Sequence, residues 1–189
     1  MFQPSETEKR ILLRIARGAV SSFLSGEPFQ PPPMAEGLLQ ERLAAFVSIH
    51  KGKTLRGCIG NLYTSRQLYL TVAETAISAA TSDPRFAPLE YNELPKVTFE
   101  ISILGPMEKV ESVEEIEISQ HGLVVTLGRA RGLLLPQVAV EHSFDRLRFL
   151  EETCKKAGLQ PGDWKSGATI HKFSASVFCE TTSEADAHR

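Results

Sequence analysis

The chain has 189 residues, of which 42% are hydrophobic and 23% are charged, and its formal net charge is −2. This length suits one domain with a core of its own, and the nearly balanced charge lacks the basic excess typical of nucleic-acid-binding proteins. No apolar run approaches the roughly 20 residues of a membrane-spanning helix, and the first ten residues lack a signal-peptide stretch. We therefore expect a cytoplasmic protein without a membrane partner. Nucleic-acid binding, which only scattered arginines support, is the least favoured of its candidate functions.

The first predicted element is a helix. Ser5 and Glu8 have the spacing of a capping box, and apolar residues then recur at helical intervals. Gly26 fits the residue at which such a helix ends. The proline-rich stretch 28–34 cannot be helical, and we expect it to run extended.

A hairpin is predicted next, with strands over residues 43–50 and 54–60 around the three-residue loop 51–53. Pairing across that loop places residue 46 opposite residue 58 and residue 49 opposite residue 55. One face then carries the apolar residues Ala45, Val47, Ile49, Leu55 and Ile59. The other face carries Phe46, Ser48, His50, Thr54, Arg56 and Cys58. Cys58 is therefore expected among polar side chains rather than in the core.

The second strand contains the hexapeptide Leu55–Gly60, which reads LRGCIG. It places Cys58 between two glycines and two residues after Arg56. A nearby cation favours the reactive thiolate form of a cysteine, and glycine permits close backbone approach. The segment is therefore either a reactive or ligand-binding loop, or a strand with a buried thiol.

The following elements alternate between helices and strands. We predict a helix from Ser65 to about Ala80, a rigid loop over 83–88 and a strand over 97–103. Asp83 and Arg85 in that loop form either a loop-locking pair or a substrate contact. A second hairpin is predicted around residues 128–132.

Pro136 follows this hairpin and can start a helical turn, from which Gln137 and Glu141 would project on one face. Their apolar surroundings suggest a partly buried carboxylate, which needs a cationic partner. The candidates are Arg56, Arg85 and Arg131. The resulting ion pair could be structural or functional.

The last elements are a helix over 144–157, capped by Ser143, and an alternating strand over 173–179. Cys154 lies on the apolar face of the helix and Cys179 on the strand, so both are expected to be structural. The three cysteines are widely spaced and suit free thiols in a reducing compartment. Neither the cysteines nor the histidines have metal-ligand spacing, and nucleotide-binding motifs are absent, so we predict no metal and no cofactor.

The ordered blocks resemble the AMMECR domain family, whose bacterial and archaeal members are called AmmeMemoRadiSam system protein A. Its signature is read in Leu55–Gly60, its second block in 82–86 with Glu93-Leu94, and its third in 131–141. Phe149-Leu150, residues 156–159 and Trp164 complete the pattern. The resemblance implies an α+β fold, with a mainly antiparallel sheet flanked by helices, in two unequal lobes with a cleft that carries the signature. Residues 5–181 would form this single domain, and 182–189 a frayed tail.

The resemblance also implies a Memo-like protein and a radical SAM enzyme as partners, but no defined reaction or oligomeric state. In one hypothesis the protein is an enzyme component with Cys58 as nucleophile or site of covalent attachment. Arg56 would then favour the thiolate, Glu141 would orient Arg56 or act as general base, and Arg85 would hold a substrate anion. In the other hypothesis the protein is a non-catalytic binding module, and Cys58 is merely small. The expected binding residues are Arg56, Gly57, Gly60, Asp83, Arg85, Gln137 and Glu141.

Overall fold

The computed structural model describes residues 3–31, 37–62 and 64–180. Contacts divide the chain into two compact units. Unit 1 consists of two segments of the chain, one that ends at Leu104 and one that begins at Ser176. Unit 2 consists of Gly105–Ala175. The predicted tail 182–189 and residues 32–34 of the proline-rich stretch lie outside the described residues.

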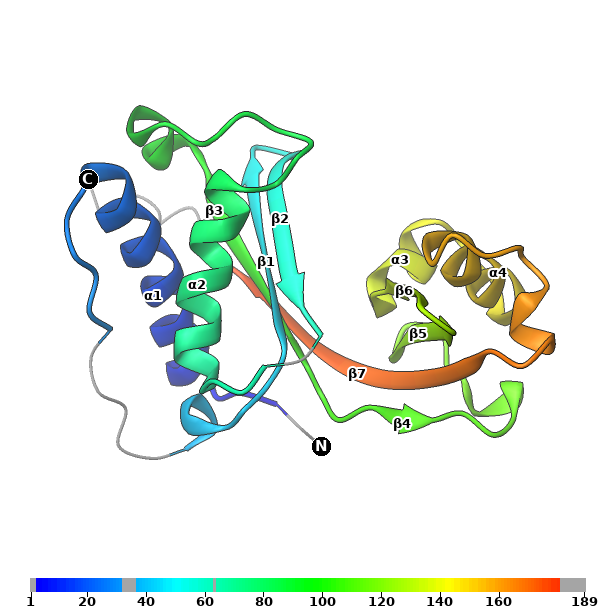
Figure 1. The fold of residues 1–189 in the computed structure, drawn as a ribbon. Coiled ribbons are helices and arrows are strands. Elements are labelled where there is room, and N and C mark those ends of the chain that lie inside the picture. The colour runs from blue at the N-terminus through cyan, green and yellow to red at the C-terminus, as the bar shows by residue number, and fades with distance from the viewer. Residues whose placement is uncertain (1–2, 32–36, 63, 181–189) are drawn as a thin grey trace. The chain divides into compact units, whose positions relative to one another are not determined.

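Unit 1 is an antiparallel sheet with two helices, α1 and α2, packed against it (Figure 1). The strand order is β2-β1-β3, and the end of β7 lies next to β3. The elements are α1 (Glu6–Ser25), η1 (Leu38–Gln40), β1 (Ala45–Lys51), β2 (Thr54–Asn61), α2 (Leu68–Thr81), η2 (Tyr91–Lys96), β3 (Thr98–Leu104) and the end of β7 (Thr169–Cys179). The core forms between the helices and the sheet and includes Leu12, Ala16, Val20, Val47, Ile49, Val72, Ala76, Phe99 and Ile101.

Both helices of unit 1 follow the predicted pattern, with one corrected boundary. Helix α1 has the full capping box between Ser5 and Glu8, and Gly26 ends it at φ +75°. Helix α2 begins at Leu68 and not at Ser65. The reason is local, because the Thr64 hydroxyl accepts the amide of Arg66 in a turn that competes with the helix.

The β1–β2 hairpin has a different register from the predicted one. Its loop contains only two residues, since Lys51 pairs with Thr54. The register then shifts between Ile49 and His50, which leaves Arg56 as the extra residue of a β-bulge. Leu55 pairs with His50, so its predicted place in the apolar stripe is wrong.

Beyond the bulge, the strands return to the predicted facing. Val47 lies opposite Ile59, and Ser48 lies opposite Cys58. The prediction of Phe46 opposite Cys58 is wrong by two residues, because the shorter loop and the bulge together shift the pairing. The prediction that Cys58 shares its face with polar neighbours is confirmed.

A buried ion pair in unit 1 fixes Glu180, the last residue that the structure describes. The guanidinium of Arg17 donates to both carboxylate oxygens of Glu180, at 2.7 and 2.5 Å, and also to the carbonyls of Leu94 and Val97. Glu180 in turn accepts the amide of Phe99 at 2.9 Å. The residue after β7 is thus fixed to α1 and to the start of β3.

Unit 2 is a small antiparallel sheet with two helices and its own core. Strand β5 pairs with β6 on one side and β7 on the other, and β4 pairs with β7. The elements are β4 (Glu108–Lys109), η3 (Val113–Glu115), β5 (His121–Leu127), β6 (Ala130–Leu134), α3 (Pro136–Glu141), α4 (Arg146–Lys156), η4 (Asp163–Lys165) and the first part of β7. The core includes Ile116, Leu123, Val125, Phe149, Leu150 and Cys154.

Two boundaries in unit 2 differ from the expectation. Helix α4 begins at Arg146 with Asp145 as its cap, because Ser143 adopts φ +53° and the Asp145 carboxylate accepts the amide of Arg148. The second hairpin has a two-residue loop, and Gly132 lies within β6. A side chain at Gly132 would collide with the backbone at Ala157, so the glycine lets β6 approach the end of α4.

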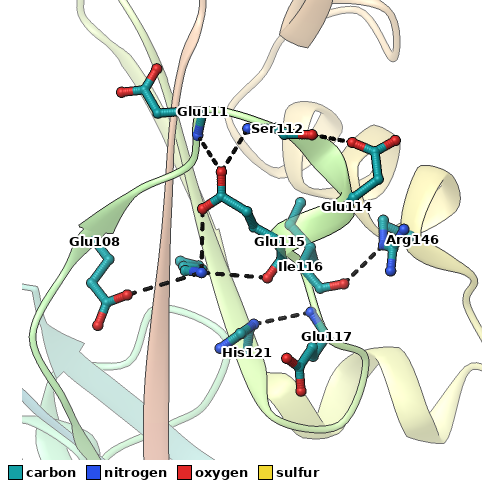
Figure 2. A network of polar contacts seen from close by, with 10 residues as sticks. Glu108, Glu111, Ser112, Glu114, Glu115, Ile116, Glu117, His121 and Arg146 are labelled. Carbon is teal, nitrogen blue, oxygen red and sulfur yellow. Dashed lines mark hydrogen bonds and ion pairs between the residues drawn. The ribbon is translucent and has the colours of Figure 1, made fainter.

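Unit 2 also contains a polar network around an acidic segment (Figure 2). The Glu115 carboxylate accepts the amides of Glu111 and Ser112, at 3.1 and 2.9 Å, and lies 3.4 Å from the ammonium of Lys172. The pKa of Glu115 is lowered, first by the Ser112 amide and then by Lys172. Backbone amides and one lysine thus compensate the central carboxylate of this acidic segment.

The observed architecture is α+β, with an antiparallel sheet flanked by helices, as predicted. None of the helices in the described ranges is long and apolar enough to cross a bilayer.

Candidate functional site

Cys58 lies on β2, the outermost strand of the unit 1 sheet, and is half-buried. The hydroxyl of Ser48 donates a hydrogen bond to its Sγ at 3.2 Å. The Cys58 amide donates to Asp83 Oδ2 at 2.8 Å, and the Cys58 carbonyl accepts from Arg85 Nη2 at 3.4 Å. Both backbone groups of Cys58 are therefore satisfied by side chains of the loop after α2, which closes the sheet edge at this residue.

Asp83 and Arg85 form a close ion pair at this edge. Asp83 Oδ1 accepts both the amide and Nε of Arg85 at 3.0 Å, and Oδ2 lies 2.7 Å from Arg85 Nη2. The pKa of Asp83 is held far below its usual range by Arg85 first and by the Cys58 amide further. Asp83 also raises the pKa of Arg85. The pair is therefore charged throughout the physiological pH range.

The two members of this pair differ in exposure. The side chain of Asp83 is 2% exposed, whereas that of Arg85 is 55% exposed. The guanidinium is fixed by Asp83 and by the Phe86 ring, whose centroid lies 5.4 Å away. Its Nη1 donates to no residue in the described part of the chain. Arg85 is thus a positioned cation with donors left for an anion.

Arg56 is engaged differently, although the sequence suggested it as the cation for Cys58. Its guanidinium donates to both oxygens of Glu93, at 3.2 and 2.9 Å. It also donates to the carbonyls of Ala87 and Pro88, at 2.8 and 3.2 Å. Each of the two charged side chains is 17% exposed. Glu93 is therefore the carboxylate that holds Arg56, and the pair fixes β2 to the segment before β3.

The signature glycines have a packing explanation. A Cβ at Gly57 would collide with the carbonyl oxygen of Ala79, so glycine is needed where β2 approaches the end of α2. A Cβ at Gly60 would collide with the ring of Phe46 on the neighbouring strand. The Phe46 ring packs over the backbone of β2 at Gly60, where no side chain covers the strand. These contacts account for both glycines without a ligand.

Gln137 and Glu141 belong to α3 in unit 2. Pro136 occupies the first turn of this helix, as predicted. Glu141 is exposed, so the expected partly buried carboxylate is wrong, and water can solvate its charge. Gln137 is half-buried, and its Oε1 has no hydrogen-bond partner among the described residues.

Two contacts of the site escaped the sequence reasoning. The Ser48–Cys58 hydrogen bond depends on the register of the two strands, and this register results from the two-residue loop and the β-bulge. The Arg56–Glu93 pair depends on a loop conformation, although Glu93 belongs to the second block of the family pattern. In the described ranges, no group of three or more histidine, cysteine, aspartate or glutamate residues is placed to hold a metal ion.

The fold and site define an α+β protein with a half-buried thiol on an edge strand, next to a positioned arginine. The AMMECR1 family model matches residues 13–178, and the chain belongs to the AMMECR1 family. A protein of Methanosarcina mazei is 40% identical over 93% of both chains. The protein Ta0236 of Thermoplasma acidophilum is 42% identical, over 91% of this chain and 87% of its own.

A solved structure shows the same fold. The crystal structure of the uncharacterized protein PH0010 from Pyrococcus horikoshii matches with a TM-score of 0.83 and 36% identity, over 89% of each chain. The resemblance inferred from the LRGCIG block and its companions is thus confirmed at the level of family and fold.

Proposed function

We propose that this AMMECR1-family protein acts through Cys58, as a nucleophile or site of covalent attachment for a ligand that carries an anionic group. The observation that carries the proposal is the setting of the thiol. It is half-buried, it accepts a hydrogen bond from Ser48, and it lies beside the fixed guanidinium of Arg85. Hydrogen-bond donors and a nearby cation both favour a thiolate.

The chemistry that suits this setting is attack by the thiolate on an electrophilic carbon. A bond forms between sulfur and that carbon, and the bond to the leaving group breaks with its electron pair. The thiol proton goes to solvent before attack, because no histidine hydrogen-bonds Cys58 in the part of the chain that the structure describes. The free donors of Arg85 would bind the anionic group of the ligand.

The proposed setting is a cytosolic system with a Memo-like protein and a radical SAM enzyme. Support for these partners comes from the family resemblance of the sequence blocks. The test is co-expression with both candidates, followed by affinity purification and mass spectrometry of the peptide that contains Cys58. We expect co-purification and a mass increase on Cys58. Unmodified Cys58 with no bound partner would contradict the proposal.

The three cysteines provide a direct test of reactivity in one sample. Cys179 is exposed, and Cys154 is buried with its thiol pKa raised by that burial. The predicted structural role of Cys179 is wrong, because Phe178 packs against the unit 1 core and the alternation of the strand turns Cys179 outward. Iodoacetamide at pH 7 should label Cys58 several-fold faster than Cys179, and Cys154 slowest. Labelling of Cys58 at or below the rate of Cys179 would exclude an activated thiolate.

A second candidate function is a non-catalytic binding module, and the packing of Gly57 and Gly60 favours it. If the signature only shapes β2, Cys58→Ser should retain partner binding and activity of the system, whereas Cys58→Phe should abolish both. If Cys58 reacts, Cys58→Ser should abolish activity while partner binding is retained. The serine variant therefore separates the two functions.

A further inference from the structure

Unit 2 has a groove whose lining residues do not include those of the Cys58 site. It has a volume of about 580 Å³ and is formed by the end of β6, by α3 with the residues after it, and by one side of α4. Its lining residues are Leu134, Val138, His142, Phe144, Arg148, Glu152, Lys155 and Lys156. Part of the groove comes from the segment 131–141, which the Cys58 chemistry does not use.

The floor of the groove is apolar. Leu134, Val138 and Phe144 supply the floor. Val140 in α3 and Leu147 in α4 do not line the groove but are 53% and 52% exposed. They are two of the few large apolar side chains with such exposure among the described residues. An apolar floor of this kind can accept the apolar side chains of a peptide segment.

The wall of the groove is positively charged. Arg148, Lys155 and Lys156 line it, and Glu152 is the single carboxylate among the lining residues. Glu152 Oε1 is already shared, at 2.7 Å, between Arg148 Nη2 and Lys155 Nζ. Arg148 Nη1 also lies 3.5 Å from Glu151, a carboxylate outside the groove lining. Lys156 forms no ion pair with a described residue. The wall therefore has a cationic excess that an acidic occupant would complement.

We propose that this groove docks an acidic peptide segment of a partner protein. Apolar side chains of the segment would occupy the floor, and its carboxylates would face Lys155 and Lys156. The apolar floor and the cationic wall together favour a segment that has both apolar and acidic side chains. The proposal does not depend on the chemistry of Cys58.

The test uses the full chain and a fluorescent amphipathic peptide built from leucine and glutamate. Two matched peptides serve as controls, one with lysine in place of glutamate and one with serine in place of leucine. Fluorescence anisotropy should show binding of the acidic peptide only. In NMR spectra of the protein, the residues whose chemical shifts change when this peptide is added should be those that line the groove. Binding of the basic peptide with equal affinity would overturn the proposal.

Variants test the location. Lys155→Glu with Lys156→Glu should weaken binding by about tenfold or more. Val138→Ser, which changes a half-buried lining residue, should weaken it several-fold in a protein that circular dichroism shows to be folded. The matched control Lys53→Glu with Lys96→Glu reverses two exposed lysines of unit 1 and should leave binding unchanged. Equal effects of the two charge reversals would overturn the proposal. So would saturation of the groove by a second copy of the chain, or by a fatty acid in preference to the peptide.

Discussion

Two ion pairs attach the segment between α2 and β3 to strand β2, and they do so in opposite ways. Arg56 and Glu93 close on each other, and two backbone carbonyls take the remaining donors of Arg56. Asp83 and Arg85 also bind each other, but Arg85 is more than half exposed next to Cys58. The first pair is a structural tie, whereas the second leaves the Arg85 guanidinium exposed.

This difference corrects the simplest interpretation of the signature. In the sequence, Arg56 is the arginine nearest to Cys58 and was expected to favour its thiolate. In the structure, the arginine that contacts Cys58 is Arg85, which lies in a loop 27 residues further along the chain. The arginine nearest to Cys58 in sequence is thus a structural residue, and the folded loop places another arginine beside Cys58.

The largest expected effect comes from the strand that both pairs hold. Gly57→Val should destabilise the protein by about 3 kcal/mol or more, because its Cβ would collide with the Ala79 carbonyl and force β2 away from α2. Gly162→Ala is the matched control, since nothing lies within 4 Å of a Cβ there. Urea unfolding measures both. Equal stability of the two variants would contradict the packing explanation of the signature.

Asp83→Asn should cost about 1.5–3 kcal/mol at pH 7, because the buried carboxylate receives charge-assisted hydrogen bonds from Arg85 and Cys58. The folded pKa of Asp83 is lowered, so its stabilisation is present above the ordinary value of 3.8 and is lost as pH falls towards the folded value. The stability difference between wild type and variant should therefore be constant from about pH 5 to 8 and shrink below pH 3.8. A difference that grows with acidification would contradict this sign.

Glu93→Gln should cost about 1–2 kcal/mol, because the amide keeps the shape but loses the charge that holds Arg56. The pKa of Glu93 is lowered chiefly by Arg56, so this loss also fades in acid. The rate of Cys58 alkylation should stay within twofold of wild type. A large fall in that rate would show that the Arg56–Glu93 pair is not purely structural.

The smallest expected effect on stability is that of Ser48→Ala, at less than about 1 kcal/mol. The same variant should slow alkylation of Cys58 several-fold, because it removes the hydrogen bond to Sγ. Peptide mapping with Cys179 as internal reference measures the change. An unchanged ratio of Cys58 to Cys179 labelling would remove Ser48 from the site.

The sequence was sufficient where a structure depends on local chemistry. Ser5, Glu8 and Gly26 marked both ends of α1, and Pro136 marked the start of α3. Alternating apolar residues located β1 and β3, and the ordered blocks identified the family.

The sequence did not predict the features that depend on tertiary contacts. The two-residue loop and the bulge at Arg56 together shift the pairing by two residues, and the contact of Gly57 with α2 lies next to the bulge. No local pattern reports such a contact, so the partners of Cys58 and Arg56 were mispredicted. The solvation of Glu141 was also invisible, because its apolar neighbours in sequence face elsewhere on a short helix.

The most direct test of the central claim compares Arg85→Gln with Arg56→Gln, after circular dichroism has shown that both variants are folded. The claim is that Arg85, and not Arg56, activates Cys58. The rate of iodoacetamide labelling at Cys58, relative to Cys179 at pH 7, should fall several-fold in Arg85→Gln and stay within twofold of wild type in Arg56→Gln. A fall in Arg56→Gln with no change in Arg85→Gln would contradict the account.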